Sequence, residues 1–236
     1  MTHDAPALLV VDDNEDNRYT LVQRLKRLGY TNVTTVVDGE EALRQLREHV
    51  FDLVLLDVMM PKMNGYEVLE RLRADERLRH VPVIMISALD QLESVVRCIE
   101  LGAEDYLPKP FNPVLLRARI GACLDKKRLR DQEVRYLQDV AKVTAAAAAV
   151  EADQFSADML GDVPGRLDEL GQLARVLLRM AVEVAAREAQ LKKTIQVLQI
   201  EIDQVQKARQ VSEITDTEYF QELRRKAKAL RQGPAT

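Results

Sequence analysis

The sequence predicts an α/β fold: a doubly wound, five-stranded parallel sheet in the first half of the chain, followed by an all-α, coiled-coil-forming region. Short apolar runs and amphipathic stretches alternate five times before residue 113. The apolar runs are continuous, which is typical of parallel strands buried on both faces. After Pro113 no strand pattern recurs, and Ala, Leu, Gln and charged residues dominate. The chain therefore changes architecture near residue 120.

Each apolar run of the first half is expected to form a strand, and each amphipathic run a helix that crosses back over the sheet. The strands are expected at 7–11, 32–37, 51–56, 81–87 and 103–108. The helices between them are expected at 18–28, 39–49, 65–74 and 91–101, and a further helix begins near Pro113.

Composition limits the classes of function. The 236 residues are 47% hydrophobic, enough for one full core with about 100 residues left over. A net charge of −4, no Trp and 4% aromatic residues argue against nucleic-acid binding. Cys98 and Cys123 lack metal-ligand spacing and fit a reducing cytoplasm. No signal peptide and no membrane span are expected, so a cytoplasmic location is predicted.

Polar residues gather where the predicted strands end. The first strand leads into Asp12 and Asp13, the third into Asp57, the fourth into Ser87, and the fifth towards Lys109. In a doubly wound sheet, ligands bind at this carboxyl edge. Clustered carboxylates repel one another, and a hard divalent cation such as Mg²⁺ would neutralise them. An Asp can also attack a phosphoryl group, which a cation, an ammonium and a hydroxyl would stabilise.

Each of these residues alone has an ordinary interpretation. Asp at a strand end is usually a turn former or a helix cap, Ser87 also suits a cap, and Lys109 suits a solvated surface. Together, however, they resemble the receiver domain of bacterial two-component response regulators over about residues 5–125. The motifs that carry the resemblance are Asp12-Asp13, Asp57 followed by Met60-Pro61 and Asn64-Gly65, Ser87-Ala88, and Lys109-Pro110.

The resemblance implies a flavodoxin-like sheet of order 2-1-3-4-5 in a receiver domain at 1–125, with Asp57 as the phosphoacceptor. It implies Mg²⁺ (or Mn²⁺) bound by Asp12, Asp13, Asp57 and the Met59 backbone carbonyl, with Asp12 acting partly through water. Phosphoryl-binding roles fall on Ser87, Ala88 and Lys109, and a switch role falls on Ser87 and Tyr106. A Tyr at this position is otherwise an ordinary half-buried packing residue. A sensor histidine kinase is the implied partner.

Two further residues bear on the lifetime of the phosphoryl group. In receivers, Met59 and Leu89 would flank the path of the hydrolytic water, and neither side chain can position that water by hydrogen bonding. Slow self-dephosphorylation is therefore expected. Beyond this reaction and self-phosphorylation from small donors, the chain is not expected to be an enzyme.

The first helix of the second half is expected to continue from the last receiver helix through 126–160. Lys127 and Arg130 interrupt its apolar path, and "MLGDVPGR" (159–166) then breaks the helix. Residues 161–185 are expected to form a connector and a second helix. "DELGQLARVLLRM" (168–180) resembles the second helix of a HAMP signalling domain, and the alternative is a helical hairpin capped by Asp168. Residues 186–236 resemble signalling coiled coils with a basic C-terminal helix.

An apolar seam along the second long helix predicts a dimer. Its spacing changes phase between Val184 and Leu191, which indicates a stutter; a single irregular seam is the alternative. So narrow a stripe needs a partner helix, so we expect a homodimer, parallel or antiparallel. The predicted seam residues are Leu170, Leu173, Leu177, Met180, Val184, Leu191, Ile195, Leu198, Ile202 and Val205.

The sequence thus predicts a response regulator of a two-component phosphorelay that acts through a dimeric helical output on a further protein. The alternative is the regulatory part of a signalling enzyme, a cyclase or phosphatase whose catalytic domain is in trans or absent. A DNA-binding transcription regulator is less favoured, because the second half shows no helix-turn-helix pattern.

Overall fold

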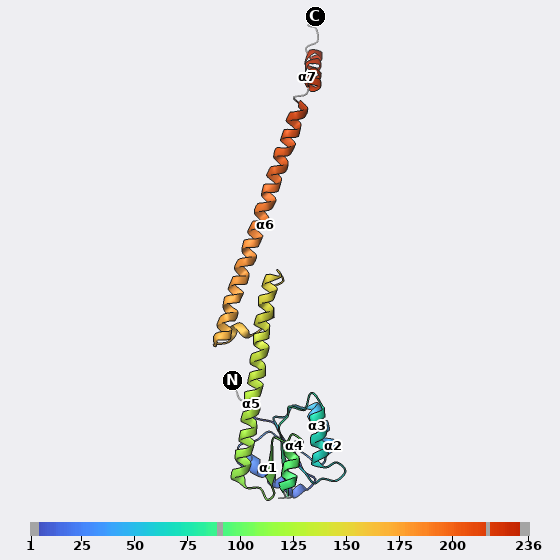
Figure 1. The fold of residues 1–236 in the computed structure, drawn as a ribbon, viewed down its shortest axis with the longest axis vertical. Helices are drawn as coiled ribbons and strands as arrows, with labels where there is room; N and C mark the ends of the chain where they lie inside the picture. The colour runs from blue at the N-terminus through green and yellow to red at the C-terminus, as the bar shows by residue number, and fades with distance from the viewer. Residues whose placement is uncertain (1–4, 89–91, 216–217, 232–236) are drawn as a thin grey trace. The chain divides into compact units, whose positions relative to one another are not determined.

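The computed structural model describes residues 5–88, 92–215 and 218–231 (Figure 1). The chain divides into two compact units, Met1–Tyr136 and Leu137–Thr236. We call them the α/β unit and the helical unit. The division lies beyond residue 125, where we expected the first domain to end, because the last helix of the α/β unit keeps contacting it for several more residues.

The α/β unit contains a parallel five-stranded sheet of order β2-β1-β3-β4-β5, which confirms the predicted fold class. Helices cover both faces, so the three inner strands β1, β3 and β4 are buried along their whole length, whereas the edge strands β2 and β5 are only partly buried. Asp57 is the last residue of its strand rather than the residue after it. The strands are β1 (Leu8–Val11), β2 (Val33–Val36), β3 (Leu53–Asp57), β4 (Val83–Ser87) and β5 (Asp105–Pro108).

Successive side chains of each strand enter different cores, because strand side chains alternate between the faces of a sheet. Leu9 and Val54 belong to one core, and Leu8 and Leu55 to the other. The first helix begins earlier than expected, because the Asn14 side chain accepts a hydrogen bond from the Asn17 amide and caps it. The crossing helices are α1 (Glu15–Arg27), α2 (Gly39–Glu48), α3 (Gly65–Ala74) and α4 (Leu92–Glu100).

Helix α5 (Pro113–Glu151) begins in the core of the α/β unit and continues past it. Beyond its buried residues, Lys127 Nζ lies 3.0 Å from Asp52 Oδ1 and Arg130 donates to the His80 carbonyl at 2.6 Å. Lys126 pairs with Glu104. Asp52, His80 and Glu104 all precede strands, so these basic residues, which we call the α5 clamp, bind the amino edge of the sheet. This explains why Lys127 and Arg130 interrupt the apolar path.

In the helical unit, α5 ends at Glu151, earlier than the expected residue 160. A connector with two short 3₁₀ turns, η1 (Ala157–Leu160) and η2 (Val163–Gly165), leads into α6 (Glu169–Thr215), and α7 (Glu218–Arg231) follows. Helix α6 is continuous across residues 185 and 186, where we expected a change of domain. None of the described helices has the length and hydrophobicity that a membrane span requires.

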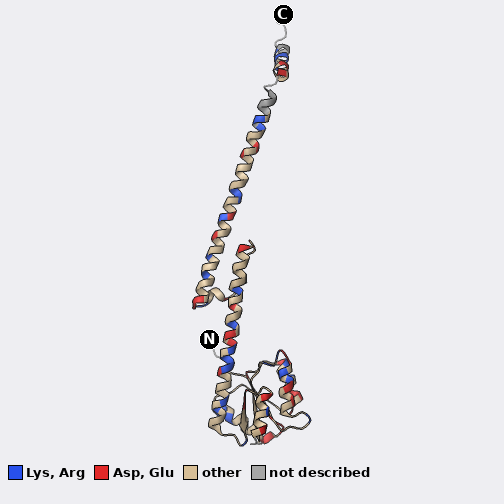
Figure 2. Ribbon diagram, in the orientation of Figure 1, with Lys and Arg blue, Asp and Glu red and all other residues tan. Residues whose placement is uncertain are grey.

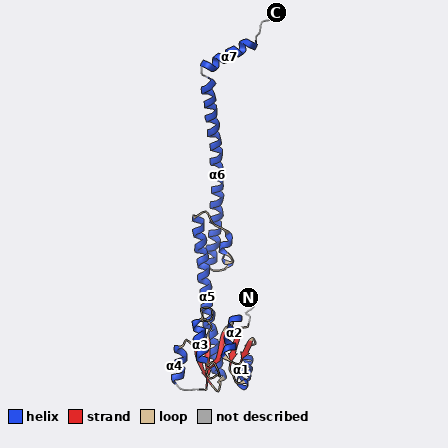
Figure 3. Cartoon of the chain, turned by 90° about the vertical axis from the view of Figure 1, so that its right-hand side faces the viewer, coloured by secondary structure: helices blue, strands red, loops and turns tan. Residues whose placement is uncertain are grey.

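The end of α5 and the start of α6 run side by side in the same direction (Figures 1 and 3). Asp139 pairs at 2.8 Å with Arg166, just before α6, whereas Asp153 after α5 lies 3.7 Å from Lys192, well along α6. The connector returns the chain to the base of α5, so these helices are parallel and do not fold back on each other as in the alternative of a helical hairpin, although Asp168 does cap α6 as that alternative expected.

A small third core holds α5, the connector and α6 together. It contains Val143 and Ala146 from α5, Leu160 and Val163 from the connector, and Leu170 and Ala174 from α6. Asp168 caps α6 by accepting a hydrogen bond from the Gly171 amide. A Cβ at Gly171 would lie 2.2 Å from the Arg166 carbonyl oxygen, so this close approach requires glycine.

Only some residues of the predicted dimer seam lie in the core of the helical unit. Leu170 is buried and Leu177 partly buried within the chain. The other eight seam residues are between 41% and 68% exposed. We call these eight the α6 stripe: Leu173, Met180, Val184, Leu191, Ile195, Leu198, Ile202 and Val205.

Candidate functional site

Strand register brings the predicted carboxylates together. Val11 pairs with Leu56 in β3, so Asp12, the next residue, lies level with Asp57. The carboxylates of Asp12, Asp13 and Asp57 each offer an oxygen within 4.8 Å of the others. Asp12 and Asp57 are buried and Asp13 is exposed, so the cluster opens to solvent on one side. This donor set of hard oxygens fits a Mg²⁺ ion.

Lys109 joins the two buried carboxylates. Its Nζ lies 2.7 Å from Asp12 Oδ2 and 2.9 Å from Asp57 Oδ1. The Lys109 amide donates to the Ser87 carbonyl at 2.7 Å, and the Lys109-Pro110 bond is cis. The loop after β5 thereby turns the Lys109 side chain towards the carboxylates. One ammonium faces three carboxylates, which leaves the site net negative.

Burial and neighbouring charge shift both pKa values. Burial raises the pKa of Asp57, the bond to Lys109 opposes this, and Asp12 and Asp13 add to the increase, so the pKa ends above its usual value. For Lys109, burial lowers the pKa, but the hydrogen bonds to Asp12 and Asp57 outweigh it and raise the pKa overall. Positive charge added beside Asp57 would therefore favour its ionised form.

Ser87 and Tyr106 lie beside the cluster. Ile86 is the register partner of Asp57, so Ser87 ends β4 one residue beyond it, and its side chain is fully buried. Tyr106 lies on β5 opposite Met85 and is buried in the core. Ala88 follows Ser87 and is exposed. Ser87 and Ala88 thus follow the register partner of Asp57 at the same edge of the sheet.

Met59 and Leu89 are the two residues predicted to affect the lifetime of the phosphoryl group. The Met59 side chain, two residues after Asp57, is 63% exposed. Leu89 lies outside the described residues. The Met59 side chain is therefore open to solvent, while its neighbour Met60 is buried.

The loop after β3 is held close to the sheet by a glycine. The Gly65 amide donates to the Val58 carbonyl at 2.9 Å, and a Cβ at Gly65 would lie 2.2 Å from the Asp57 carbonyl oxygen. Asn64 and Glu67 form a capping box that starts α3 at this point. The backbone around Asp57 is therefore fixed on both sides.

Sequence reasoning missed the residues that hold Asp12. The Asn17 side-chain amide donates to Asp12 Oδ1 at 3.2 Å, and Arg18 donates to the Asp12 carbonyl at 2.7 Å. Both lie in the first turns of α1, and a polar first turn directly after two aspartates could have suggested them. Asn17 also lines a cavity of about 320 Å³ with Arg24, Lys109 and Phe111.

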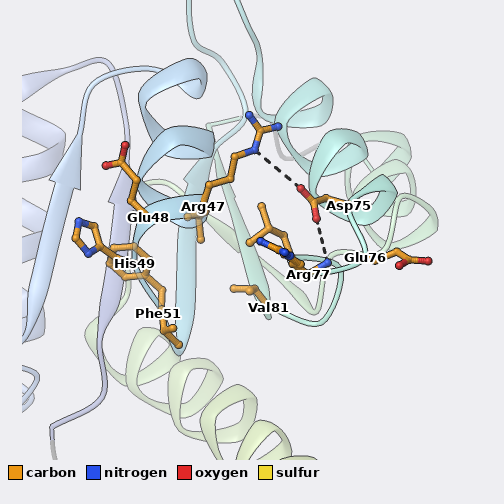
Figure 4. Close-up of a pocket in the computed structure, with 11 residues that line it drawn as sticks. Arg47, Glu48, His49, Phe51, Asp75, Glu76, Arg77 and Val81 are labelled. Carbon is orange, nitrogen blue, oxygen red and sulfur yellow. Dashed lines mark hydrogen bonds and ion pairs between the residues drawn. The ribbon is translucent and has the colours of Figure 1, made fainter.

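A larger hollow lies at the opposite edge of the sheet. Its volume is about 600 Å³, and it is lined by His49 and Phe51 before β3 and by Asp75 and Arg77 after α3. Figure 4 shows these residues. Arg47 and Asp75 pair across it at 3.9 Å. Asp57 and Ser87 lie at the other ends of their strands, so this hollow does not belong to the carboxylate site.

Comparison with known proteins agrees with this geometry. Residues 8–121 match the response regulator receiver domain. A crystal structure from Chloroflexus aurantiacus, described as a response regulator, is 33% identical with a TM-score of 0.50, and the match covers 52% of this chain and 99% of that one. The chain belongs to the response regulator receiver family. From here on we call the α/β unit the receiver.

Curated relatives extend the comparison. The probable transcriptional regulator ycf27 of Cyanidium caldarium is 43% identical over 133 residues, covering 56% of this chain and 52% of the relative. The transcriptional regulatory protein PhoP of Bacillus subtilis, named for alkaline phosphatase synthesis, is 42% identical over 122 residues, covering 52% and 50%. This chain thus spans about half the length of these relatives.

One relative matches more of the chain. The response regulator PleD of Caulobacter vibrioides is 38% identical over 184 residues, covering 76% of this chain and 37% of PleD. A match of this length must continue past residue 121, where the receiver match ends. The similarity to PleD therefore includes part of the helices after the receiver domain.

Proposed function

We propose that this protein is a phosphoacceptor of a two-component relay, and that Asp57 takes a phosphoryl group from a sensor histidine kinase in the cytoplasm. The observation that carries the proposal is the Asp57 carboxylate at the end of β3, 2.9 Å from the Lys109 ammonium and beside two further carboxylates. Mg²⁺, or Mn²⁺, would be held by Asp12, Asp13, Asp57 and the Met59 carbonyl. On its own the chain is not an enzyme.

The chemistry follows from the neighbours of Asp57. A carboxylate oxygen of Asp57 forms a bond to phosphorus while the bond from phosphorus to the donor atom breaks, which gives an acyl phosphate. Lys109, which bridges two carboxylates, is within reach to bind a phosphoryl oxygen instead. The Ser87 hydroxyl and the Ala88 amide would bind the others. The divalent cation, when bound, supplies positive charge to the same oxygens.

The response would pass from the site to the helices. Ser87 ends β4 and Tyr106 lies on the adjoining strand β5, so a change at Ser87 can reach β5 directly. Helix α5 follows β5 and contributes residues to both units. The output is then a changed helical unit, which acts as a HAMP-like, coiled-coil homodimer on a further protein.

Two other outputs remain as alternatives. The chain could supply the regulatory part of a signalling enzyme, and the similarity to PleD beyond residue 121 is compatible with that role. Several relatives are named transcriptional regulators, but their matches cover 117 to 133 residues, about the length of a receiver. The long described helix α6 supports a helical output.

The test is phosphorylation of the full chain by acetyl phosphate with Mg²⁺, followed by a phosphate-affinity gel. We expect wild type and Asp75→Asn, a control at the opposite edge of the sheet, to shift alike. We expect Asp57→Asn to give no shifted band and Asp13→Asn to require more Mg²⁺. Unchanged labelling of Asp57→Asn would show that another residue accepts the phosphoryl group.

A further inference from the structure

Helix α6 presents two apolar faces, and the chain itself covers only one of them. Leu170, Ala174, Leu177 and Ala181 form the inner face, buried or partly buried within the helical unit. At about 100° per residue, the α6 stripe falls within about 40° of one line, roughly 70° from the inner face. Figure 2 shows the same helix as mainly uncharged, with isolated charged residues along it.

The stripe keeps one direction over its whole length because eleven-residue repeats are combined in it with seven-residue steps. Leu173, Val184 and Ile195 form one such series, and Met180, Leu191 and Ile202 form another. At about 100° per residue, an eleven-residue step drifts by about +20° and a seven-residue step by about −20°, so the two drifts cancel where both occur. The phase change near Val184 is therefore what keeps the stripe straight, and a regular partner helix can follow it from Leu173 to Val205.

A polar interval in the stripe identifies that partner. Between Val184 and Leu191, the stripe is flanked by Arg187 on one side and Glu188 on the other, at about −40° and +60° from its line. Within the chain, Arg187 lies 3.6 Å from Glu183, and Glu188 lies 3.6 Å from Lys192. These pairs are exposed and leave both side chains able to reach a neighbour.

The orientation of a second copy decides which charges meet. In a parallel pair in register, the flank that carries Arg187 faces the flank of the partner that carries Glu188, so two opposite-charge pairs form at one level. An antiparallel pair centred here would bring Arg187 against Arg187 and Glu188 against Glu188. The first arrangement satisfies both the charges and the apolar repeat.

We infer that the α6 stripe binds the α6 stripe of a second copy of this chain, parallel and in register, with reciprocal Arg187–Glu188 pairs between Val184 and Leu191. This deepens the proposed dimeric output and rests on it only for its role in signalling. The pairing itself can be tested without phosphorylation, and the Asp57 labelling assay reports on the proposed function independently.

Charge reversal in the full chain tests the register. Arg187→Glu and Glu188→Arg should each weaken self-association by about tenfold, since each replaces two attractive pairs with two repulsive ones. An equimolar mixture of the two variants should recover the wild-type dimer, because each then meets the opposite charge. Sedimentation measures all three samples, and Lys193→Glu serves as the control away from the stripe.

A mixture that stays as weak as the separate variants would overturn the parallel register. A wild-type chain that remains monomeric across the concentration range would overturn the inference as a whole.

Single cysteines test the orientation. Met180→Cys and Ile202→Cys should both form disulfide-linked dimers on mild oxidation, since only a parallel pair brings each position against itself. Val182→Cys and Ile200→Cys, on the opposite side of α6, should stay unlinked. Equal linking at all four positions, or linking at neither stripe position, would contradict the inference.

Discussion

The receiver and the helical unit treat their apolar residues in opposite ways. In the receiver, Leu55, Leu116 and Ile120 are fully buried, and the apolar strand residues lie between helices of the same chain. In the helical unit, α6 buries one apolar face and leaves the α6 stripe exposed. The receiver buries its apolar residues within one chain, whereas the helical unit leaves an apolar stripe exposed, for which we proposed a second copy as the partner.

The largest effect is expected from the buried ammonium of the receiver. Lys109→Ala should lower the free energy of unfolding of the receiver by about 4 kcal/mol without Mg²⁺, because it leaves Asp12 and Asp57 buried without their cation. Urea denaturation measures this. Lys62→Ala, which removes an exposed pair with Asp38, should cost under about 0.5 kcal/mol. Equal losses in the two variants would show that the carboxylate pair is solvated.

A matched pair of core and stripe substitutions tests the comparison directly. Leu55→Ala should cost about 3 kcal/mol because it opens a cavity in a closed core. Leu191→Ala should cost little in dilute protein, where its side chain faces water, and should weaken self-association at high concentration. A large loss for Leu191→Ala in the dilute monomer would contradict the division between the two units.

The third core is the exception within the helical unit, since it closes within one chain. Gly171→Ala should destabilise the connector by about 2 kcal/mol, because the new Cβ would meet the Arg166 carbonyl. Limited proteolysis between α5 and α6 reports this. Gly165→Ala is the control, as no atom lies near its Cβ position, and it should be cut at the wild-type rate.

The smallest effect is expected on the lifetime of the phosphoryl group at Asp57. Combining Met59→Asn with Leu89→Glu should shorten the phosphoryl lifetime, because polar side chains can position the hydrolytic water that apolar ones cannot. Loss of label after removal of the donor gives the rate. A lifetime that stays the same in the double variant would exclude this explanation, and Met60→Leu, at a buried neighbour, serves as the control.

The receiver could be predicted well from the sequence, because each of its strands is marked by a short, continuous apolar run. Continuous apolar runs define the strands, and parallel order brings Asp12, Asp57 and Lys109 to one edge. Which residues of the helical unit are buried depends on the path of the connector, and the spacing of apolar residues in the sequence does not predict that path. Leu170 and Leu177 share the seven-residue spacing of Leu191, yet the returning connector turns them towards α5. The role of Lys127 was equally hidden, since it depends on Asp52, which is distant in the sequence.

The α5 clamp has a consequence for the order in which the receiver is completed on the ribosome. Asp52 accepts a hydrogen bond from the Ala7 amide and pairs with Lys127, so one carboxylate joins the start of the chain to a residue beyond position 121. The Asp52–Lys127 ion pair can therefore form only after residue 127 has left the ribosome, when all five strands have already been synthesised. For the same reason, a receiver expressed on its own should end at Tyr136, the last residue of the unit, and not at residue 121, where the family match ends.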